Sequence, residues 1–160
     1  MKKTLCAAGV LVFLAVAARA QDAKPNFSGT WRLDIAKSDF GAAPAPESIV
    51  HVIEHKEPNV KLTTTQKNAQ GELTNERALT TDGQENTNKM RTTAGDTEAK
   101  STSKWDGKKL GTAMHFDVQG VTININDTWE LSADAKVLTI IREIKTPQGD
   151  FSQTTIYNKQ

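Results

Sequence analysis

The stretch Phe27-Ser28-Gly29-Thr30-Trp31-Arg32-Leu33 sets the pattern that the rest of the chain follows. Alternate side chains of an extended strand lie on the same face, so Phe27, Gly29 and Trp31 share one apolar face. Gly29 places no side chain beside the large indole, which suits a position where another segment or a ring comes close. The stretch therefore predicts a first strand whose apolar face is turned toward a core.

Residues 1–20 have the composition of a secretory signal peptide. Lys2 and Lys3 precede an apolar run from Leu5 to Ala18, and Ala18-Arg19-Ala20 supplies a small-x-small cleavage pattern. The apolar run is too short for an ordinary membrane-spanning helix. We therefore expect cleavage before Gln21, a secreted or periplasmic location, no membrane span, and one domain over residues 21–160.

Charge and cysteine content restrict the partners of this domain. Cys6 is the only cysteine and lies in the signal sequence, so residues 21–160 cannot form a disulfide. The formal charge of the chain is +1, and removal of Lys2, Lys3 and Arg19 leaves −2. No basic stripe is present to attract nucleic acid. No Gly-rich phosphate loop or dinucleotide fingerprint is present either, and we expect no cofactor.

From Ser48 onward, segments rich in Thr, Val and Ile alternate with short turn signals. These turns are Glu57-Pro58-Asn59, Ala69-Gln70-Gly71, Asp82-Gly83, Ala94-Gly95-Asp96, Asp106-Gly107, Gln119-Gly120, Ser132-Ala133-Asp134 and Pro147-Gln148-Gly149. This spacing is typical of a meander of hairpins and predicts about ten antiparallel strands with little helix. Residues 34–47 contain a glycine and two prolines, so we expect a loop with at most one helical turn. We favour a surface connector over a ligand lid for this loop.

A ten-stranded sheet exposes two unpaired edges unless it closes. Closure as an up-and-down barrel removes these edges, and ten strands leave room for an internal cavity. The sequence therefore predicts an all-β, antiparallel up-and-down meander barrel. The alternative architecture is a sandwich of two sheets, which would have no cavity.

Three short motifs resemble a known group of barrels. Phe27 to Leu33 resembles the first strand of the calycins, which include lipocalins and fatty-acid-binding proteins. Lys104-Trp105-Asp106-Gly107-Lys108 resembles a turn of the fatty-acid-binding proteins, and Thr154 to Lys159 resembles their terminal strand. The resemblance implies a calycin-like barrel over residues 25–160 that binds a small, mainly hydrophobic ligand. Thr155 stands where that family has a carboxylate-binding arginine, and the helical lid has no room, so we do not predict a fatty-acid-binding protein.

The phase of alternation predicts which side chains face the interior. The clearest alternation is that of Val121, Ile123 and Ile125 with polar residues between them. When the same alternation is continued through the other strands, the inward-facing residues are polar in the middle of the chain and apolar toward its C-terminus. The predicted ligand-binding residues are Arg77, Met90, Met114, Phe116, Trp129, Arg142 and Tyr157. A buried guanidinium needs a partner. Arg142 could pair with Asp127 or reach solvent, or it could orient a polar head group together with Tyr157.

His51-Val52-Ile53-Glu54-His55 matches the His-x-x-Glu-His pattern of some zinc peptidases. That chemistry requires a helix, whereas this run is β-branched. On a strand the two histidines would be about 13 Å apart at about 3.3 Å per residue, too far to share one ion. We expect a half-exposed strand without a metal site.

No Gly-x-Ser-x-Gly motif is present, and residues 21–160 contain no cysteine nucleophile. We therefore expect a monomeric, non-enzymatic lipocalin-like protein that holds a small hydrophobic ligand inside the barrel. The alternative is an envelope interaction or inhibitor module with no internal ligand, which would present a sizeable exposed apolar patch.

Overall fold

Ten strands account for most of the chain in the computed structural model, which describes residues 23–92 and 94–160. The strands are β1 (Gly29–Leu33), β2 (Ser48–Lys56), β3 (Asn59–Asn68), β4 (Gly71–Thr80), β5 (Asp82–Thr92), β6 (Gly95–Asp106), β7 (Lys109–Val118), β8 (Val121–Leu131), β9 (Val137–Thr146) and β10 (Gly149–Lys159). A single-turn 3-10 helix, η1 (Ile35–Lys37), follows β1. The predicted signal peptide lies outside the described residues.

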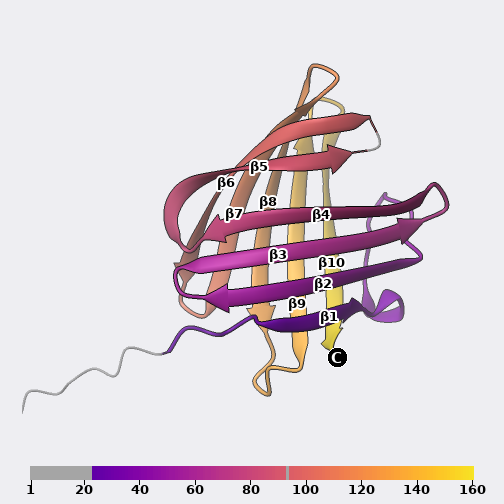
Figure 1. Ribbon diagram of the computed structural model, residues 1–160. Helices are drawn as coiled ribbons and strands as arrows, with labels where there is room; N and C mark the ends of the chain where they lie inside the picture. Colours follow the sequence, from indigo (N-terminus) through magenta and orange to yellow (C-terminus); the bar gives the residue numbers. More distant parts are fainter. Residues whose placement is uncertain (1–22, 93) are drawn as a thin grey trace, which may run out of the picture.

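Each strand pairs antiparallel with its neighbours in the order β4-β3-β2-β1-β10-β9-β8-β7-β6-β5. The first and last strands meet, with Trp31 opposite Lys159 and Leu33 opposite Tyr157. This pairing curls the meander into a nearly closed up-and-down barrel whose two terminal strands are β4 and β5 (Figure 1). The predicted barrel is confirmed, and the two-sheet sandwich is wrong.

Asparagine side chains connect β4 to β5, which diverge from their shared turn (Figure 1). The amide of Asn88 accepts from the backbone N–H of Ala78 at 2.7 Å and donates to the Ala78 carbonyl at 3.0 Å. Asn75 makes the same pair of bonds to Arg91, at 2.7 and 3.0 Å. A side-chain amide carries the same donor and acceptor as a peptide group. Asparagine side chains thus bridge the two strands, and we call this boundary the seam.

The segment between β1 and β2 is fastened along β10. The backbone N–H groups of Asp34 and Asp39 donate to the carbonyls of Ile156 and Thr154, each at 2.7 Å. Gly41 has a φ of +57°, and a Cβ there would collide with the Ser152 carbonyl oxygen. The segment is a connector, the role that the sequence favoured, and it contains the predicted single helical turn.

One end of the barrel is closed by tight packing. This closed end contains Phe27 and the β2–β3, β4–β5, β6–β7 and β8–β9 turns. Its buried apolar residues are Phe27, Trp31, Leu33, Ile53, Val60, Leu62, Leu79, Leu110, Trp129, Leu138, Ile140 and Tyr157. The Trp31 indole N–H donates to the Phe27 carbonyl at 2.8 Å, and Phe27 stacks on Trp105 at 5.8 Å. The apolar face predicted for the first strand therefore forms the centre of this core.

Gly29 and Glu57 complete the closed end. A Cβ at Gly29 would lie 2.7 Å from the Lys159 side chain, whose ammonium lies 5.1 Å above the Trp31 ring. The close neighbour of Gly29 is therefore a lysine stem rather than backbone or a ring. The Glu57 carboxylate accepts from Thr81 at 2.6 Å and from Trp105 at 3.0 Å, which ties three parts of this end together.

Inward-facing residues at the opposite end are less covered. This open end contains the β3–β4, β5–β6, β7–β8 and β9–β10 turns. Its inward-facing residues that are only half-buried are Gln66, Leu73, Asn75, Met90, Val118, Ile123, Ile144, Phe151 and Gln153. The barrel is therefore packed at one end and accessible at the other.

Candidate functional site

A layer of polar side chains crosses the interior between two apolar clusters. Its members come from seven strands, and period-2 alternation turns each of them inward. They are His51, Arg77, Ser101, Ser103, Thr112, Asp127, Arg142, Thr155 and the hydroxyl end of Tyr157. All except Arg142, which is half-buried, are buried. We call this set the polar layer.

Arg142 and Asp127 form a bidentate ion pair inside the barrel. The residues lie opposite each other on β9 and β8, and the guanidinium donates from Nε to Oδ1 and from Nη2 to Oδ2, both at 2.7 Å. Burial opposes ionisation of Asp127, but the charge and hydrogen bonds of Arg142 outweigh it and hold the pKa of Asp127 below its usual value. Of the roles considered for Arg142, pairing with Asp127 is the one present in the structure.

The exposure of this pair is uneven. The Asp127 side chain is 2% exposed, whereas the Arg142 side chain is 32% exposed although it points inward. Water therefore reaches the Arg142 side chain, whereas Asp127 is shielded from it.

Arg77 has a very different environment. It is 8% exposed, and its guanidinium makes one hydrogen bond, from Nη1 to the sulfur of Met114 at 3.2 Å. Among residues 23–92 and 94–160, no carboxylate lies within ion-pair distance of it. Burial lowers the pKa of Arg77 and the charge of Arg142 lowers it further, while Asp127 partly offsets both. A thioether is a weak acceptor for a group with five donors, so Arg77 is poorly compensated.

His51 and Tyr157 add no charge to the polar layer at neutral pH. Burial, with the charges of Arg77 and Arg142, lowers the pKa of His51 to about 3. Its Nδ1 lies 2.9 Å from the Thr64 hydroxyl, and its ring lies 4.5 Å from that of Tyr157. Burial raises the pKa of Tyr157. Two guanidinium groups thus face one carboxylate, which leaves a formal charge of +1 on the layer.

An unpartnered hydroxyl lies near Arg77. Ser101 is 3% exposed, and its Oγ has no hydrogen-bond partner within the described part of the chain. Ser101 lies opposite Met114 in the β6–β7 pairing, and the Met114 sulfur accepts from Arg77. An unused hydroxyl and a poorly compensated guanidinium therefore lie beside the same methionine.

Between the polar layer and the open end the inward-facing side chains are mainly apolar, and we call this part of the interior the chamber. Its wall consists of the buried residues Ala99, Met114, Phe116 and Ile125 and the half-buried residues Met90, Val118, Ile123 and Ile144. Several of these apolar residues are only half-buried, and the polar layer beside them supplies a few polar groups, a combination that is typical of ligand sites.

The structure divides the predicted ligand-binding residues into three groups. Met90, Met114 and Phe116 line the chamber. Arg77, Arg142 and Tyr157 belong to the polar layer. Trp129 lies in the core of the closed end at 1% exposure, beneath that layer. Sequence reasoning did not assign His51 or Ser101 to the site, although the alternation had already turned Ser101 inward.

The two histidines of the zinc-like motif lie on strand β2, as predicted. The strand is half-exposed, as predicted: Val52 and Glu54 lie on its exposed face, whereas His51 and His55 lie on its buried face and are each 7% exposed. Both side chains point into the barrel. His55 lies at the closed end, where its Nε2 is 2.9 Å from Glu57 Oε1 and its Nδ1 accepts a hydrogen bond from the Phe27 N–H. In the described part of the chain, no group of three or more His, Cys, Asp or Glu residues could hold a metal ion.

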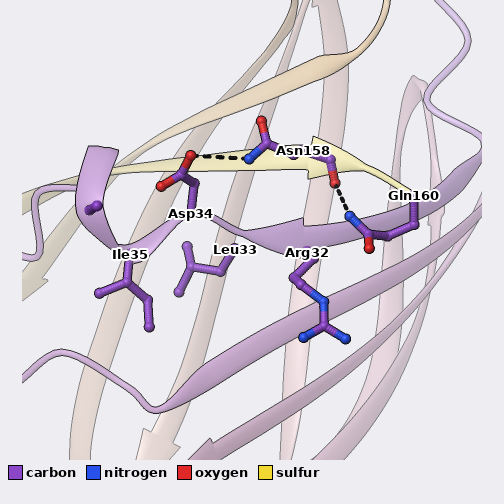
Figure 2. A pocket seen from close by; sticks show the side chains of 7 residues that line it. Arg32, Leu33, Asp34, Ile35, Asn158 and Gln160 are labelled. Atoms are coloured by element: carbon purple, nitrogen blue, oxygen red, sulfur yellow. Dashed lines mark hydrogen bonds between the residues drawn. The ribbon is translucent and has the colours of Figure 1, made fainter.

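The described residues also form surface depressions outside the chamber. One, of about 360 Å³, is beside η1, where Asn158 donates to Asp34 at 3.0 Å and Gln160 donates to the Asn158 carbonyl (Figure 2). It contains none of the predicted site residues. The other, of about 370 Å³, runs along the seam and is lined by Asn59, Val60, Lys61, Glu76, Arg77, Ala78, Leu79, Thr80, Asn86 and Asn88. No helix in the described ranges is long and apolar enough to span a membrane.

No family model and no curated protein matches the sequence. Among solved structures, zebrafish ileal bile acid-binding protein complexed with cholic acid is 17% identical, with a TM-score of 0.53 over 84% of this chain and 98% of that one. Secretory abundant heat soluble protein 4 from Ramazzottius varieornatus is 15% identical, with a TM-score of 0.54 over 86% of this chain and 96% of that one. At these identities the likeness concerns the fold, and it confirms the calycin-like barrel.

Proposed function

We propose that this protein binds a small, mainly hydrophobic molecule in the chamber and has no catalytic activity. The fold supports this proposal, because a neighbour of similar fold is described as a bile acid-binding protein complexed with cholic acid. Fold alone does not assign a function, so the argument depends on the chamber itself.

The exposure of inward-facing side chains carries the proposal. Met90, Ile123 and Ile144 point into the barrel, yet they are only half-buried, and Arg142 beneath them is 32% exposed. Apolar side chains that face an accessible internal space gain free energy when an apolar molecule displaces water from them. The closed-end core offers no such gain because its side chains already cover one another.

The proposal also covers where the protein acts and whether it acts as a monomer. The charged and apolar pattern of residues 1–20 supports export, so we place the binding function in a secreted or periplasmic compartment, with the protein acting as a monomer. Mass spectrometry of the N-terminus of protein recovered from its host tests cleavage before Gln21, and sedimentation tests the monomer.

If the protein were instead an interaction module, we would expect a sizeable apolar patch on its surface. Within the described residues the exposed large hydrophobic side chains are Ile35, Val52 and Ile141, which belong to η1, β2 and β9. Isolated apolar residues of this kind are normal on protein surfaces. The exposure pattern therefore favours the chamber.

Two isoleucines of β9 provide a matched test. Ile144 faces the chamber, whereas Ile141 faces outward and is 42% exposed. We expect Ile144→Trp to fill part of the chamber and weaken binding of the neutral dye N-phenyl-1-naphthylamine by about tenfold or more, about 1.4 kcal/mol or more. Ile141→Trp should leave dye affinity unchanged.

The measurement is a fluorescence titration, with circular dichroism to confirm that both variants fold. Equal dye affinity in the two variants, or no saturable dye binding to the wild-type protein, would contradict the proposed internal site. Native mass spectrometry of protein purified from its host would then identify any retained molecule.

A further inference from the structure

We infer that residues 23–28 form a plug over the closed end of the barrel, and that His55 makes the seating of this plug sensitive to pH. The plug is held while the His55 ring is neutral and loosens when the ring takes up a second proton. This inference goes beyond the proposed function, because it concerns the closed end and requires no internal ligand.

The plug is anchored by one aromatic residue. Phe27 is fully buried, and its ring stacks on His55 and on Trp105, with both centroid distances at 5.8 Å. Lys24 donates to the Gly107 carbonyl at 2.9 Å, and the residues of the plug other than Phe27 are exposed or half-buried. Phe27 and its backbone therefore provide most of the attachment.

Two hydrogen bonds fix which nitrogen of His55 carries the proton. The Phe27 N–H donates to Nδ1 at 3.2 Å, and a backbone N–H can only donate, so Nδ1 has a free lone pair. Nε2 lies 2.9 Å from Glu57 Oε1, so Nε2 carries the proton and donates to the carboxylate. Ser28 adds a second attachment to the same residue, because its Oγ accepts from the His55 backbone N–H at 2.9 Å. The neutral ring is therefore the form that accepts a hydrogen bond from the plug.

A second proton on the ring removes this acceptor. Imidazolium has a proton on both nitrogens, so no rotation of the ring restores the bond. The His55 side chain is 2% exposed, so water does not replace the ring as the acceptor while Phe27 is seated. The Phe27 N–H would then be buried without a partner, which is unfavourable for a backbone group. Release of the plug exposes this N–H to water and removes the penalty.

The charges around the ring decide how the proton is coupled to the plug. Glu57 favours the charged ring, but it lies in the β2–β3 turn beside His55, so its effect is largely the same with the plug seated or released and cancels from the coupling. The Lys24 ammonium lies across the Trp105 ring, 5.5 Å from its centroid, and opposes a second positive charge only while the plug is seated. Strand β3 presents Val60 to the ring and β6 presents Trp105, and neither titrates. The interactions that differ between the seated and released plug therefore disfavour the proton.

Hydrogen exchange of the Phe27 amide measures the seating of the plug. Protection is expressed relative to the intrinsic exchange rate at each pH, which removes the direct effect of pH on exchange. We expect this protection to fall about tenfold between pH 7.5 and pH 5, where imidazole changes charge, because one lost buried hydrogen bond corresponds to about this factor. The Trp129 amide, in the same core but outside the plug, is the reference and should lose less protection.

Three variants test the role of the ring. His55→Gln keeps a donor and an acceptor but cannot titrate, so the fall at Phe27 should be absent whatever the protection at pH 7.5. Glu57→Gln removes the charge that favours imidazolium, so the fall should occur at lower pH. His115→Gln, at an exposed position on β7, is the matched control and should behave as the wild-type protein does.

A fall at Phe27 that persists in His55→Gln, or an equal fall at Phe27 and Trp129, would overturn the inference. Nitrogen NMR of the wild-type ring tests it without any variant. At pH 7.5 the proton should be on Nε2, and the chemical shift of the Phe27 amide should follow the titration of His55. A proton on Nδ1 at pH 7.5, or a Phe27 amide that does not respond to this titration, would contradict the inference even if His55→Gln does not fold.

Discussion

At the scale of single residues, the interior contains ionisable groups whose charge states are fixed by one another. Asp127 is ionised because Arg142 binds both of its oxygens, and His51 is neutral because it is buried between cations. The sequence predicted the Asp127–Arg142 option from inward phase alone. It could not predict that Arg77 is left without a carboxylate, because that depends on which of two arginines reaches the single aspartate.

His51 makes stability depend on pH in a defined direction. Its pKa falls from 6.5 in the unfolded chain to about 3 in the folded protein, so between these values the unfolded chain binds a proton that the folded protein does not. Stability should therefore be full above about pH 6.5 and should decline toward pH 3, by at most about 1.4 kcal/mol per pH unit from this group.

The measurement is the free energy of unfolding in urea at several pH values. His51→Gln, which keeps a polar side chain but cannot titrate, should flatten the wild-type decline between pH 6 and 4. His115→Gln, at an exposed position on β7, serves as the control and should leave the decline unchanged. Parallel curves for wild type and His51→Gln in that interval would contradict the assignment.

At the scale of strands, alternation predicted the inner face correctly because one residue of slippage would turn every apolar side chain outward. The hairpins were predicted correctly as well, because a turn depends on a few neighbouring residues. The seam was not predictable in this way. Asn75 and Asn88 fit the inward pattern, but their amides bond sideways to β4 and β5 backbone, and such pairing depends on how far the two strands diverge.

The seam gives a prediction about Asn88. Asn88→Ala removes both bonds to Ala78, and we expect a loss of about 1–3 kcal/mol in the free energy of unfolding because the Ala78 N–H and C=O lose their partners. Asn88→Asp keeps an acceptor for the Ala78 N–H but loses the donor to its carbonyl, so its effect should be intermediate.

Hydrogen exchange of the Ala78 amide is the specific readout, and it should accelerate most in Asn88→Ala. Asn124→Ala, on the exposed face of β8, is the comparison and should change neither quantity. If Ala78 exchanges at the wild-type rate in Asn88→Ala, the side-chain bridge does not hold the seam.

At the scale of the whole molecule, the barrel combines a packed end with an accessible end, and the proposed function depends on this asymmetry. Closure could be predicted from the edge problem of ten strands, and the pairing of β1 with β10 confirms it. The location of the open half could not, because the inward apolar residues of both ends look alike in sequence. Packing distinguishes them: Trp31 and Trp129 are fully buried at one end, whereas Met90 and Ile144 are only half-buried at the other.

This asymmetry should be visible in backbone hydrogen exchange without any mutation. Local opening is easiest where few buried apolar contacts hold the backbone. In ligand-free protein, amides in the open-end halves of β3 to β8 should exchange about tenfold or more faster than amides in their closed-end halves. N-phenyl-1-naphthylamine should then slow exchange in the open half, because a ligand that binds only the folded state stabilises the regions it contacts. Protection concentrated at the closed end, around Phe27 and Trp129, would contradict binding in the chamber. A ligand gains free energy by displacing water from apolar side chains, and the closed-end side chains are already buried against one another.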